Sequence, residues 1–366
     1  DDLQGLADFS SDGIYLLPET VSDLPPIAGI MTAGEGNPLS HVQLLARNLG
    51  IPNVGVDSAM LPTIRQHNGE TVVMAVSPAG LVELANDGPR WDALFDKTEV
   101  AADVVIRPDL DKLDLSVKRF MNLEELSADD SGRTVGPKAA KLGELHKRFP
   151  EAVSSGVAIP FGVFKQAVLD QRYAGSEQTV FEWMLQNYRH LDTLPADSTE
   201  RSDTEERFRA ELYDLILNTR LSADLQQQLR TAMLAAFGSV DDVGVFIRSD
   251  TNVEDLPGFT GAGLNLTLPN VVGFDQIIAG IPRVWASPFT ARAYAWRQSH
   301  MDSPEHVYPA VLLLQSVSND KSGVMVTQDI DTGDRAILSV AVNEGVGGAV
   351  DGQSAESLRI DTVSYT

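Results

Sequence analysis

Residues Thr32–His41 read TAGEGNPLSH and lead into VQLLARNLGIPNVGV, the most informative stretch of the chain. The glycine-rich loop ends at Ser40, a favoured N-cap residue, and the apolar spacing that follows predicts a helix ending at Gly50. His41 would then lie in the first helical turn, where unpaired backbone N–H groups and the helix dipole favour an anion. Imidazole is a nucleophile near neutral pH, so the position suits a histidine that carries a phosphate. The alternative is a histidine that only packs or caps.

The composition is that of an acidic globular chain. Its 366 residues are 43% hydrophobic and 22% charged, enough for two or three domains, and the formal net charge is −24. This charge disfavours nucleic acid and anionic membranes as partners. There is no cysteine, which excludes disulfides, thiolate metal sites and cysteine nucleophiles. No apolar run reaches membrane-spanning length and the N-terminus lacks signal-peptide order, so we expect no membrane span and a cytoplasmic location.

The order of apolar strands, glycine turns and helical spacings predicts two domains. We expect an α/β domain over residues 1–95, a charged linker over 96–132, and an α+β domain over 133–366. The first residue is not Met and the last residues resemble a strand, so we also expect a piece of a longer protein.

The second domain is predicted to mix helices with strands. Three-to-four spacing predicts helices at 135–149, within 163–238 and at 274–300. Apolar runs predict strands at 243–249, 264–271, 310–317, 322–330 and 336–342.

Several residues of this domain suit phosphate binding. Lys138 opens a helix after a glycine turn, although most helical lysines are simply solvated. Arg248 ends an apolar strand ahead of a polar, glycine-rich loop, and an arginine there can hold a phosphate bidentately. The alternative for Arg248 is an ion pair with Asp250, Glu254 or Asp255.

Two further features are weaker indications. Gly261-Ala262-Gly263 would leave backbone N–H groups open to a ligand, but a short glycine loop is not specific. Gln315 follows an apolar strand and could pair with the edge of a base or be a polar strand end. We assign the other five histidines to surfaces and predict no metal site among them, since none has a partner at ligand spacing.

Together these segments resemble the PEP-utilising dikinases: phosphoenolpyruvate synthase, pyruvate phosphate dikinase and the glucan water dikinases. The segment from Thr32 is similar to their phosphohistidine motif. VGPKAAKLGEL, FIRSDTNVEDLPGFTGAGLNLTLPNV, IPRVWASPFTARAYAWR, AVLLLQSVSNDKSGVMVTQDIDTG and NEGVGGAVDG follow in the family's order. The resemblance implies a small swivelling phosphohistidine domain followed by an ATP-grasp nucleotide domain.

The resemblance also implies a reaction and the residues that serve it. ATP and Mg²⁺ are expected, with the ATP β-phosphate passing to a histidine and then to an acceptor, and with AMP and phosphate released. His41 would carry the phosphate and Thr32 would contact it. Lys138 and Arg248 would clamp the nucleotide phosphates. The remaining positions would cover the phosphates or meet the adenine: Gly261, Ala262, Gly263 and Gln315.

This sequence departs from the family in three respects. The carrier segment precedes the nucleotide domain, as in the glucan water dikinases. Asp250 stands where the family usually has a small residue. The family's closing segment, with its metal ligands, would lie beyond Thr366, so the C-terminal part of the domain is expected to be missing.

Three functions stay open at this stage. Pyruvate is preferred as the acceptor, glucan is the alternative, and a non-catalytic ATP-binding or regulatory module is the third. The acceptor would be a small molecule bound by a domain outside this chain, and a homo-oligomer is allowed.

Overall fold

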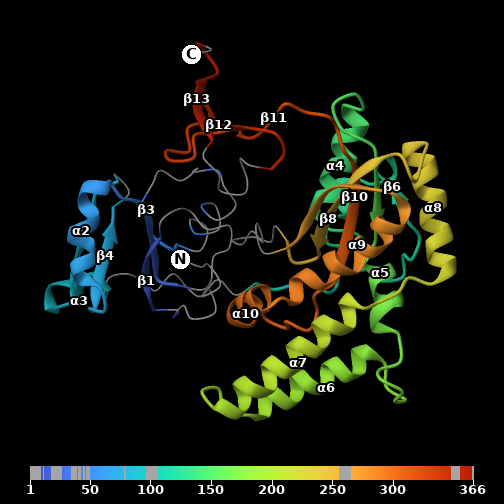
Figure 1. Ribbon diagram of the computed structural model, residues 1–366, viewed down its shortest axis with the longest axis horizontal. Coiled ribbons are helices and arrows are strands. Elements are labelled where there is room, and N and C mark those ends of the chain that lie inside the picture. The colour runs from blue at the N-terminus through green and yellow to red at the C-terminus, as the bar shows by residue number, and fades with distance from the viewer. Residues whose placement is uncertain are drawn as a thin grey trace. The chain divides into compact units, whose positions relative to one another are not determined.

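The computed structural model describes residues 10, 12–17, 27–33, 39, 43, 46, 50–77, 80–95, 106–254, 265–347 and 355–364. The chain divides into two compact units: unit 1 is Asp1–Val104 with Ser318–Thr366, and unit 2 is Val105–Val317 (Figure 1). Residues 106–132, expected as part of a linker, lie in unit 2, where Leu123 and Leu126 are buried in its core. The boundaries at 95 and 133 stay a prediction.

Unit 2 is built on a five-stranded antiparallel sheet of order β6-β7-β10-β8-β9. In the central strand, Leu312 pairs with Ala158 on one side and Arg248 on the other. The strands are β6 Met121–Asn122, β7 Gly156–Ile159, β8 Gly244–Thr251, β9 Thr267–Val272 and β10 Pro309–Gln315.

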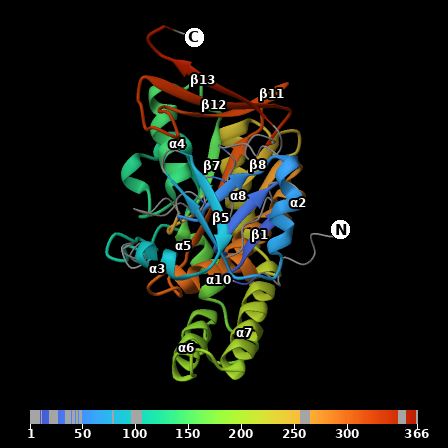
Figure 2. The ribbon, with the colours of Figure 1, turned by 90° about the vertical axis from the view of Figure 1, so that its left-hand side faces the viewer.

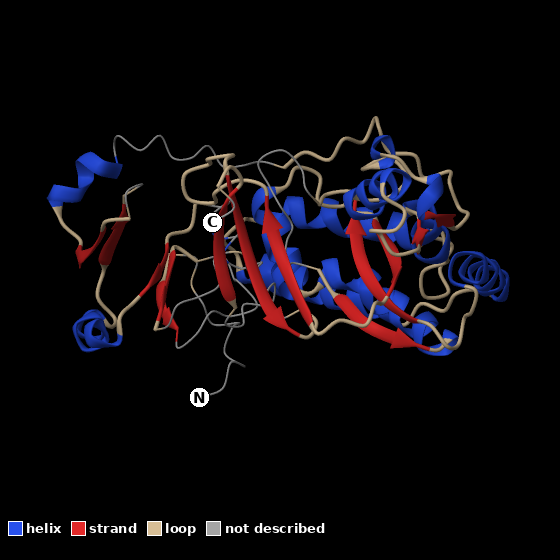
Figure 3. Ribbon diagram, turned by 90° about the horizontal axis from the view of Figure 1, so that it is seen from above, coloured by secondary structure: helices blue, strands red, loops and turns tan. Residues whose placement is uncertain are grey.

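Helices surround this sheet, and Figure 3 distinguishes them from strands by colour. Helices α6 and α7 lie side by side and extend away from the sheet (Figures 1 and 2). Their N-termini are capped by the side chains of Thr179 and Ser198. The described helices of unit 2 are α4 Pro137–Arg148, α5 Phe161–Phe164, α6 Val180–Thr193, α7 Thr199–Leu217, α8 Ala223–Phe237, α9 Phe274–Ala286 and α10 Ala291–His300. Shorter turns are η4 Leu123–Glu125, η5 Ala128–Asp130, the π-helical η6 Lys165–Leu169 and η7 Ser287–Phe289.

The two faces of the sheet pack against different helices. Val245 and Ile247 of β8 point into the main core with α5 to α9, which contains the completely buried Trp285. Because successive side chains of a strand alternate, Leu312 faces the other way, onto α4. We call this second side of the sheet the α4 face.

The single helix predicted over 274–300 is wrong, because the chain breaks into α9, η7 and α10. Pro288 has no backbone N–H and its ring clashes with the carbonyl four residues earlier, so it ends a regular helix. The hydroxyl of Ser287 donates to the Val284 carbonyl (2.8 Å), and Thr290 takes an extended conformation before α10. The apolar spacing continues through the break, since Ser287–Phe289 stay buried.

Unit 1 contains three small sheets among its described residues. A parallel sheet has the order β1-β2-β3, and a hairpin pairs β4 with β5. An antiparallel sheet has the order β11-β12-β13. The strands are β1 Ile14–Leu17, β2 Gly29–Thr32, β3 Asn53–Gly55, β4 Val72–Val76, β5 Val82–Asn86, β11 Lys321–Val326, β12 Ile337–Glu344 and β13 Glu356–Asp361. The helical elements are η2 Ser58–Met60, α2 Leu61–Ile64, η3 Arg65–His67 and α3 Pro89–Phe95.

The expected mixture of helices and strands is present in the structure. Over the described part of the chain, none of the helices combines the length and hydropathy needed to cross a bilayer.

Candidate functional site

The first turn of α4 lies against the end of β8 in unit 2. Gly136 occupies the N-cap position with an extended backbone, and Pro137 follows at the first helical position, where its fixed φ suits a helix start. Ala139 and Ala140 are completely buried against the α4 face of the sheet. The glycine cap provides no side chain for the free N–H groups of this turn, so another residue must satisfy them.

Asp250 of β8 provides the missing cap. Its Oδ1 accepts the backbone N–H of Lys138 (2.8 Å) and its Oδ2 accepts that of Ala139 (3.1 Å). Asp250 has no exposed surface. A Cβ at Gly136 would lie 2.6 Å from the backbone carbonyl carbon of Asp250, so only glycine fits there without a shift. A carboxylate of the chain itself therefore occupies the helix N-terminus, a position that otherwise suits an anionic ligand.

The ammonium group of Lys138 is held at the end of the same strand. Its Nζ donates to the Ser249 carbonyl oxygen (2.9 Å) and forms an ion pair with Glu254. The Lys138 side chain is 27% exposed and that of Glu254 is 6% exposed. A lysine ammonium has three N–H donors, so these two contacts leave one for another acceptor. The lysine expected to be either phosphate-binding or solvated is thus fixed by the protein, and its role stays a prediction.

Two acids share this one lysine, and the pKa of Asp250 reflects it. The pKa of Asp250 is raised to about 7, because burial and, after it, the nearby Glu254 carboxylate raise it by more than Lys138 and the two backbone N–H bonds lower it. The lysine makes its direct ion pair with Glu254, so the charge of Asp250 is stabilised mainly by backbone groups.

Arg248 lies on the same face of the sheet, two residues before Asp250. It is partly buried and pairs across the strands with Leu312, which packs on α4. Over the described part of the chain, its guanidinium has no hydrogen-bond or ion-pair partner. Of the acids considered as partners, Asp250 and Glu254 are engaged with α4, and Asp255 lies outside the described residues. Among the described residues, nothing occupies the Arg248 guanidinium on the α4 face, and its pairing with Asp255 stays a prediction.

The segment after β8 is anchored by Asn252. Its Nδ2 donates to the His306 carbonyl oxygen (2.9 Å), and its Oδ1 accepts the backbone N–H of Tyr308 (2.7 Å). These bonds fasten the polar segment to the start of β10. The backbone that carries Glu254 is therefore fixed. The Oε2 atom of Glu254 also accepts the Thr251 backbone N–H (3.4 Å).

Gln315 is not brought to the same place. It is the last residue of β10 and pairs with Val245, whose side chain points into the main core, so alternation directs it away from the α4 face. Its backbone N–H donates to the Ser155 carbonyl oxygen (2.9 Å). Its predicted adenine contact would have to be made from the end of the strand and stays a prediction.

The other predicted residues lie elsewhere or outside the described residues. Thr32 is the last residue of β2 in unit 1, is 1% exposed, and accepts the Val56 N–H at its carbonyl oxygen (2.7 Å). His41 and the loop of Gly261, Ala262 and Gly263 lie outside the described residues. Their assignments stay predictions.

Comparison with known families bears on the part of the chain that contains Lys138 and Arg248. Residues 132–357, more than half of the chain, match the family described as the pyruvate phosphate dikinase AMP/ATP-binding domain. The chain belongs to this family. The predicted membership of the PEP-utilising dikinases is confirmed, and the AMP/ATP-binding domain includes both cations of the α4 face.

Curated proteins with similar sequences are phosphotransferases. A probable phosphoenolpyruvate synthase of Methanothermobacter thermautotrophicus is 34% identical over 245 residues, covering 65% of this chain and 33% of the relative. The phosphoenolpyruvate synthase of Pyrococcus furiosus is 30% identical over 264 residues (63% and 31%). Rifampicin phosphotransferase of Bacillus subtilis is 29% identical over 216 residues (59% and 23%). The matches span a third or less of each relative's length.

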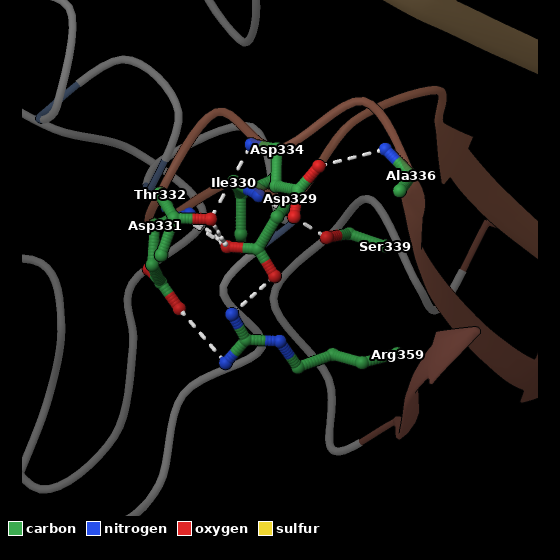
Figure 4. A network of polar contacts seen from close by, with 8 residues as sticks. All are labelled: Asp329, Ile330, Asp331, Thr332, Asp334, Ala336, Ser339 and Arg359. Carbon is green, nitrogen blue, oxygen red and sulfur yellow. Dashed lines mark hydrogen bonds and ion pairs between the residues drawn. The ribbon is translucent and has the colours of Figure 1, made fainter. Parts of the chain in front are cut away.

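A second polar network lies in the loop between β11 and β12, within the residues that match the family, and includes Arg359 just beyond them (Figure 4). Oδ1 of the fully buried Asp329 accepts the backbone N–H groups of Asp331 (2.9 Å) and Thr332 (2.8 Å). Arg359 of β13 forms ion pairs with Asp329 and Asp331. The Thr332 N–H and the Arg359 guanidinium hold the pKa of Asp329 down at about 2, so this carboxyl is ionised at neutral pH.

The domain's described residues do not form a metal centre. Over the described ranges, no group of three or more His, Asp or Glu side chains is placed to hold a metal ion. The acids near Lys138 are engaged with the helix and its ammonium. No residue of this chain is therefore assigned as a Mg²⁺ ligand.

The sequence analysis missed the contacts of Asp250 and Glu254 with α4. Both were considered only as partners of Arg248 or as a departure from the family. The available signal was a helix start with a glycine cap and no capping side chain, together with acids directly after a buried strand.

Proposed function

We propose that this chain is the nucleotide-binding and phosphate-carrying part of an ATP-dependent dikinase. One observation carries the proposal: within an AMP/ATP-binding domain, Lys138 and Arg248, which has no partner among the described residues, lie on one face of the sheet. Two cations on a rigid strand and helix suit a polyphosphate, because phosphoryl transfer depends mostly on positioning and charge neutralisation.

The proposed reaction begins with attack of the His41 imidazole on the β-phosphorus of ATP. The bond from that phosphorus to the oxygen bridging it to the α-phosphate breaks, and AMP leaves. Water then removes the γ-phosphate as inorganic phosphate, and His41 keeps the β-phosphate. Lys138 and Arg248 would neutralise charge on the phosphates, and Gly261 to Gly263 would cover them. A swivelling domain that contains Thr32 and His41 would carry the phosphate to the acceptor.

Mg²⁺ is expected to accompany ATP, where it would screen the phosphate charge. The described residues provide no ligand set for it.

Pyruvate is the proposed acceptor, because two of the relatives are named phosphoenolpyruvate synthases. Glucan is the alternative acceptor. Two features that resemble the glucan water dikinases support it: the threonine nine residues before His41 and the segment RSDTNVEDLPGF. A larger organic molecule is a further alternative, given the similarity to rifampicin phosphotransferase. The acceptor would bind to a domain outside this chain, in a cytoplasmic protein whose oligomeric state is open.

A non-catalytic module is the second candidate function. Asp250 favours it, because a carboxylate already occupies the N-terminus of α4. In that case nucleotide would bind without transferring phosphate.

The test is labelling of the whole protein that carries this chain with ATP containing ³²P at the β position and Mg²⁺. We expect acid-labile label on the protein, and none on the His41→Ala variant. Loss of the label to added pyruvate or to glucan identifies the acceptor. An unlabelled protein that still binds ATP would instead establish the non-catalytic module.

A further inference from the structure

We propose that Asp250 and Glu254 are positioning residues for Lys138, one acting through the backbone and the other through the ammonium group. The inference rests on the proposed function, in which Lys138 binds a nucleotide phosphate. It assigns to two acids after β8 a role in phosphate binding, although neither would touch the phosphate.

Asp250 fixes where the lysine begins. Its two carboxylate oxygens accept the N–H groups of Lys138 and Ala139, so the first turn of α4 is bonded to β8 at two points. Gly136 leaves the space that this close approach needs. Side-chain sites on fixed helices and strands hold their geometry better than sites on loops. The Cα of Lys138 is therefore set by β8, an interior strand of the sheet.

Glu254 fixes where the lysine ends. A lysine side chain has a flexible stem of four carbons, so without a partner its ammonium group samples many positions. Here the ammonium is bonded to the Ser249 carbonyl oxygen and paired with a carboxylate that is 6% exposed. Asn252 fastens the backbone between these two partners. The remaining N–H of Lys138 is the one left to reach an acceptor outside the cluster.

A competing role for Glu254 predicts the opposite effect of its removal. If Glu254 only paired with the Lys138 ammonium until a phosphate displaced it, the Glu254→Gln variant would bind ATP more tightly. If it positions the lysine, the neutral variant binds ATP more weakly, because the ammonium is no longer held.

The test measures binding of ATP and of adenosine to the whole protein by calorimetry. We expect Glu254→Gln and Asp250→Asn each to weaken ATP binding about tenfold and to leave adenosine binding unchanged. Glu177→Gln, at a side chain that is 98% exposed, is the matched control and should change neither. Because Asn keeps one acceptor oxygen, Asp250→Asn should retain the fold, which circular dichroism checks, and Asp250→Ala should weaken ATP binding further.

A double-mutant cycle makes the test specific. In a Lys138→Met background, Glu254→Gln should have no further effect on ATP binding, since its action is through the lysine. Tighter ATP binding by Glu254→Gln, or equal loss of ATP and adenosine binding, overturns the inference. If Lys138→Met weakens ATP binding while the two acid variants do not, the inference fails alone. If Lys138→Met leaves ATP binding unchanged, the proposed role of Lys138 fails with it.

Discussion

Asp250 of unit 2 and Asp329 of unit 1 are both fully buried, and both accept two backbone N–H groups, yet their acidities differ widely. The pKa of Asp250 is raised to about 7, whereas that of Asp329 is lowered to about 2. Two backbone hydrogen bonds therefore do not by themselves keep a buried carboxyl charged.

Burial is the largest cause of the raised pKa of Asp250, whereas the Thr332 N–H bond is the largest cause of the lowered pKa of Asp329, and the way each acid shares its cation adds to the difference. Asp329 is paired directly with Arg359, in addition to its bonds with Thr332. Near Asp250, the Lys138 ammonium pairs with Glu254 instead, and the Glu254 charge repels a second negative charge. One lysine between two acids leaves one of them close to protonation.

The largest expected contrast is in the acidities themselves. Carbon-13 NMR of aspartate-labelled protein should show a midpoint near pH 7 for Asp250 and near pH 2 for Asp329. Because the native state then binds more protons at Asp250 than the unfolded state does, the free energy of unfolding should fall as the pH rises from about 4 to about 7. Asp329 contributes stability above about pH 4, lost as the pH falls toward 2. The Asp250→Asn variant should lose the pH dependence between about pH 4 and pH 7 and keep the one at lower pH. A titration midpoint below pH 5 for Asp250 would contradict the comparison.

The second effect concerns the stability of the protein when Lys138, which two acids share, is replaced. Lys138→Met should lower the free energy of unfolding by about 3 kcal/mol, because it leaves the buried Glu254 without its cation. Urea unfolding measures this loss. Lys138→Met with Glu254→Gln should recover much of it, and equal stabilities of the single and double variants would show that the stranded charge is not the cause.

The third effect is steric. Gly136→Ala should lower the free energy of unfolding by about 2 kcal/mol, since its Cβ would press on the Asp250 backbone. Gly88→Ala is the matched control, because no atom lies within 4 Å of the added Cβ there. A Gly136→Ala protein as stable as the control would mean that α4 can shift away from β8 without loss.

The smallest effect is expected at the exposed cation of the other network. Arg359→Lys keeps the charge but loses the two-pronged contact with Asp329 and Asp331. Since Arg359 is 55% exposed, we expect the Tm to fall by about 2 °C or less. A much larger fall in a thermal melt would make this network the more important of the two for stability.

The local elements could be predicted because their causes are local. The glycine-proline turn and the following alanines predict α4, and the apolar run before Arg248 predicts β8. The break at Pro288 was missed because buried apolar residues continue through it. The facing direction of Gln315 depends on the strand register, which the sequence alone does not provide.

The connections within the site could not be predicted in the same way. Lys138 is separated by 112 residues from Asp250 and by 116 from Glu254, and no periodicity relates such distant positions. The sequence indicated which residues can bind phosphate. It could not indicate that two nearby acids would fasten one of them, since that requires the packing of α4 on the sheet. The role of His41 remains a prediction.

The close approach of Gly136 to Asp250 has a consequence for the history of the sequence. The backbone of position 250, and not only its side chain, fills the space beside position 136, so no replacement at 250 alone makes room there. Among homologous chains that keep this contact, glycine should therefore persist at the first position whichever residue stands at the second. A larger residue at the first position would mark a lineage in which the start of the helix has moved away from the strand.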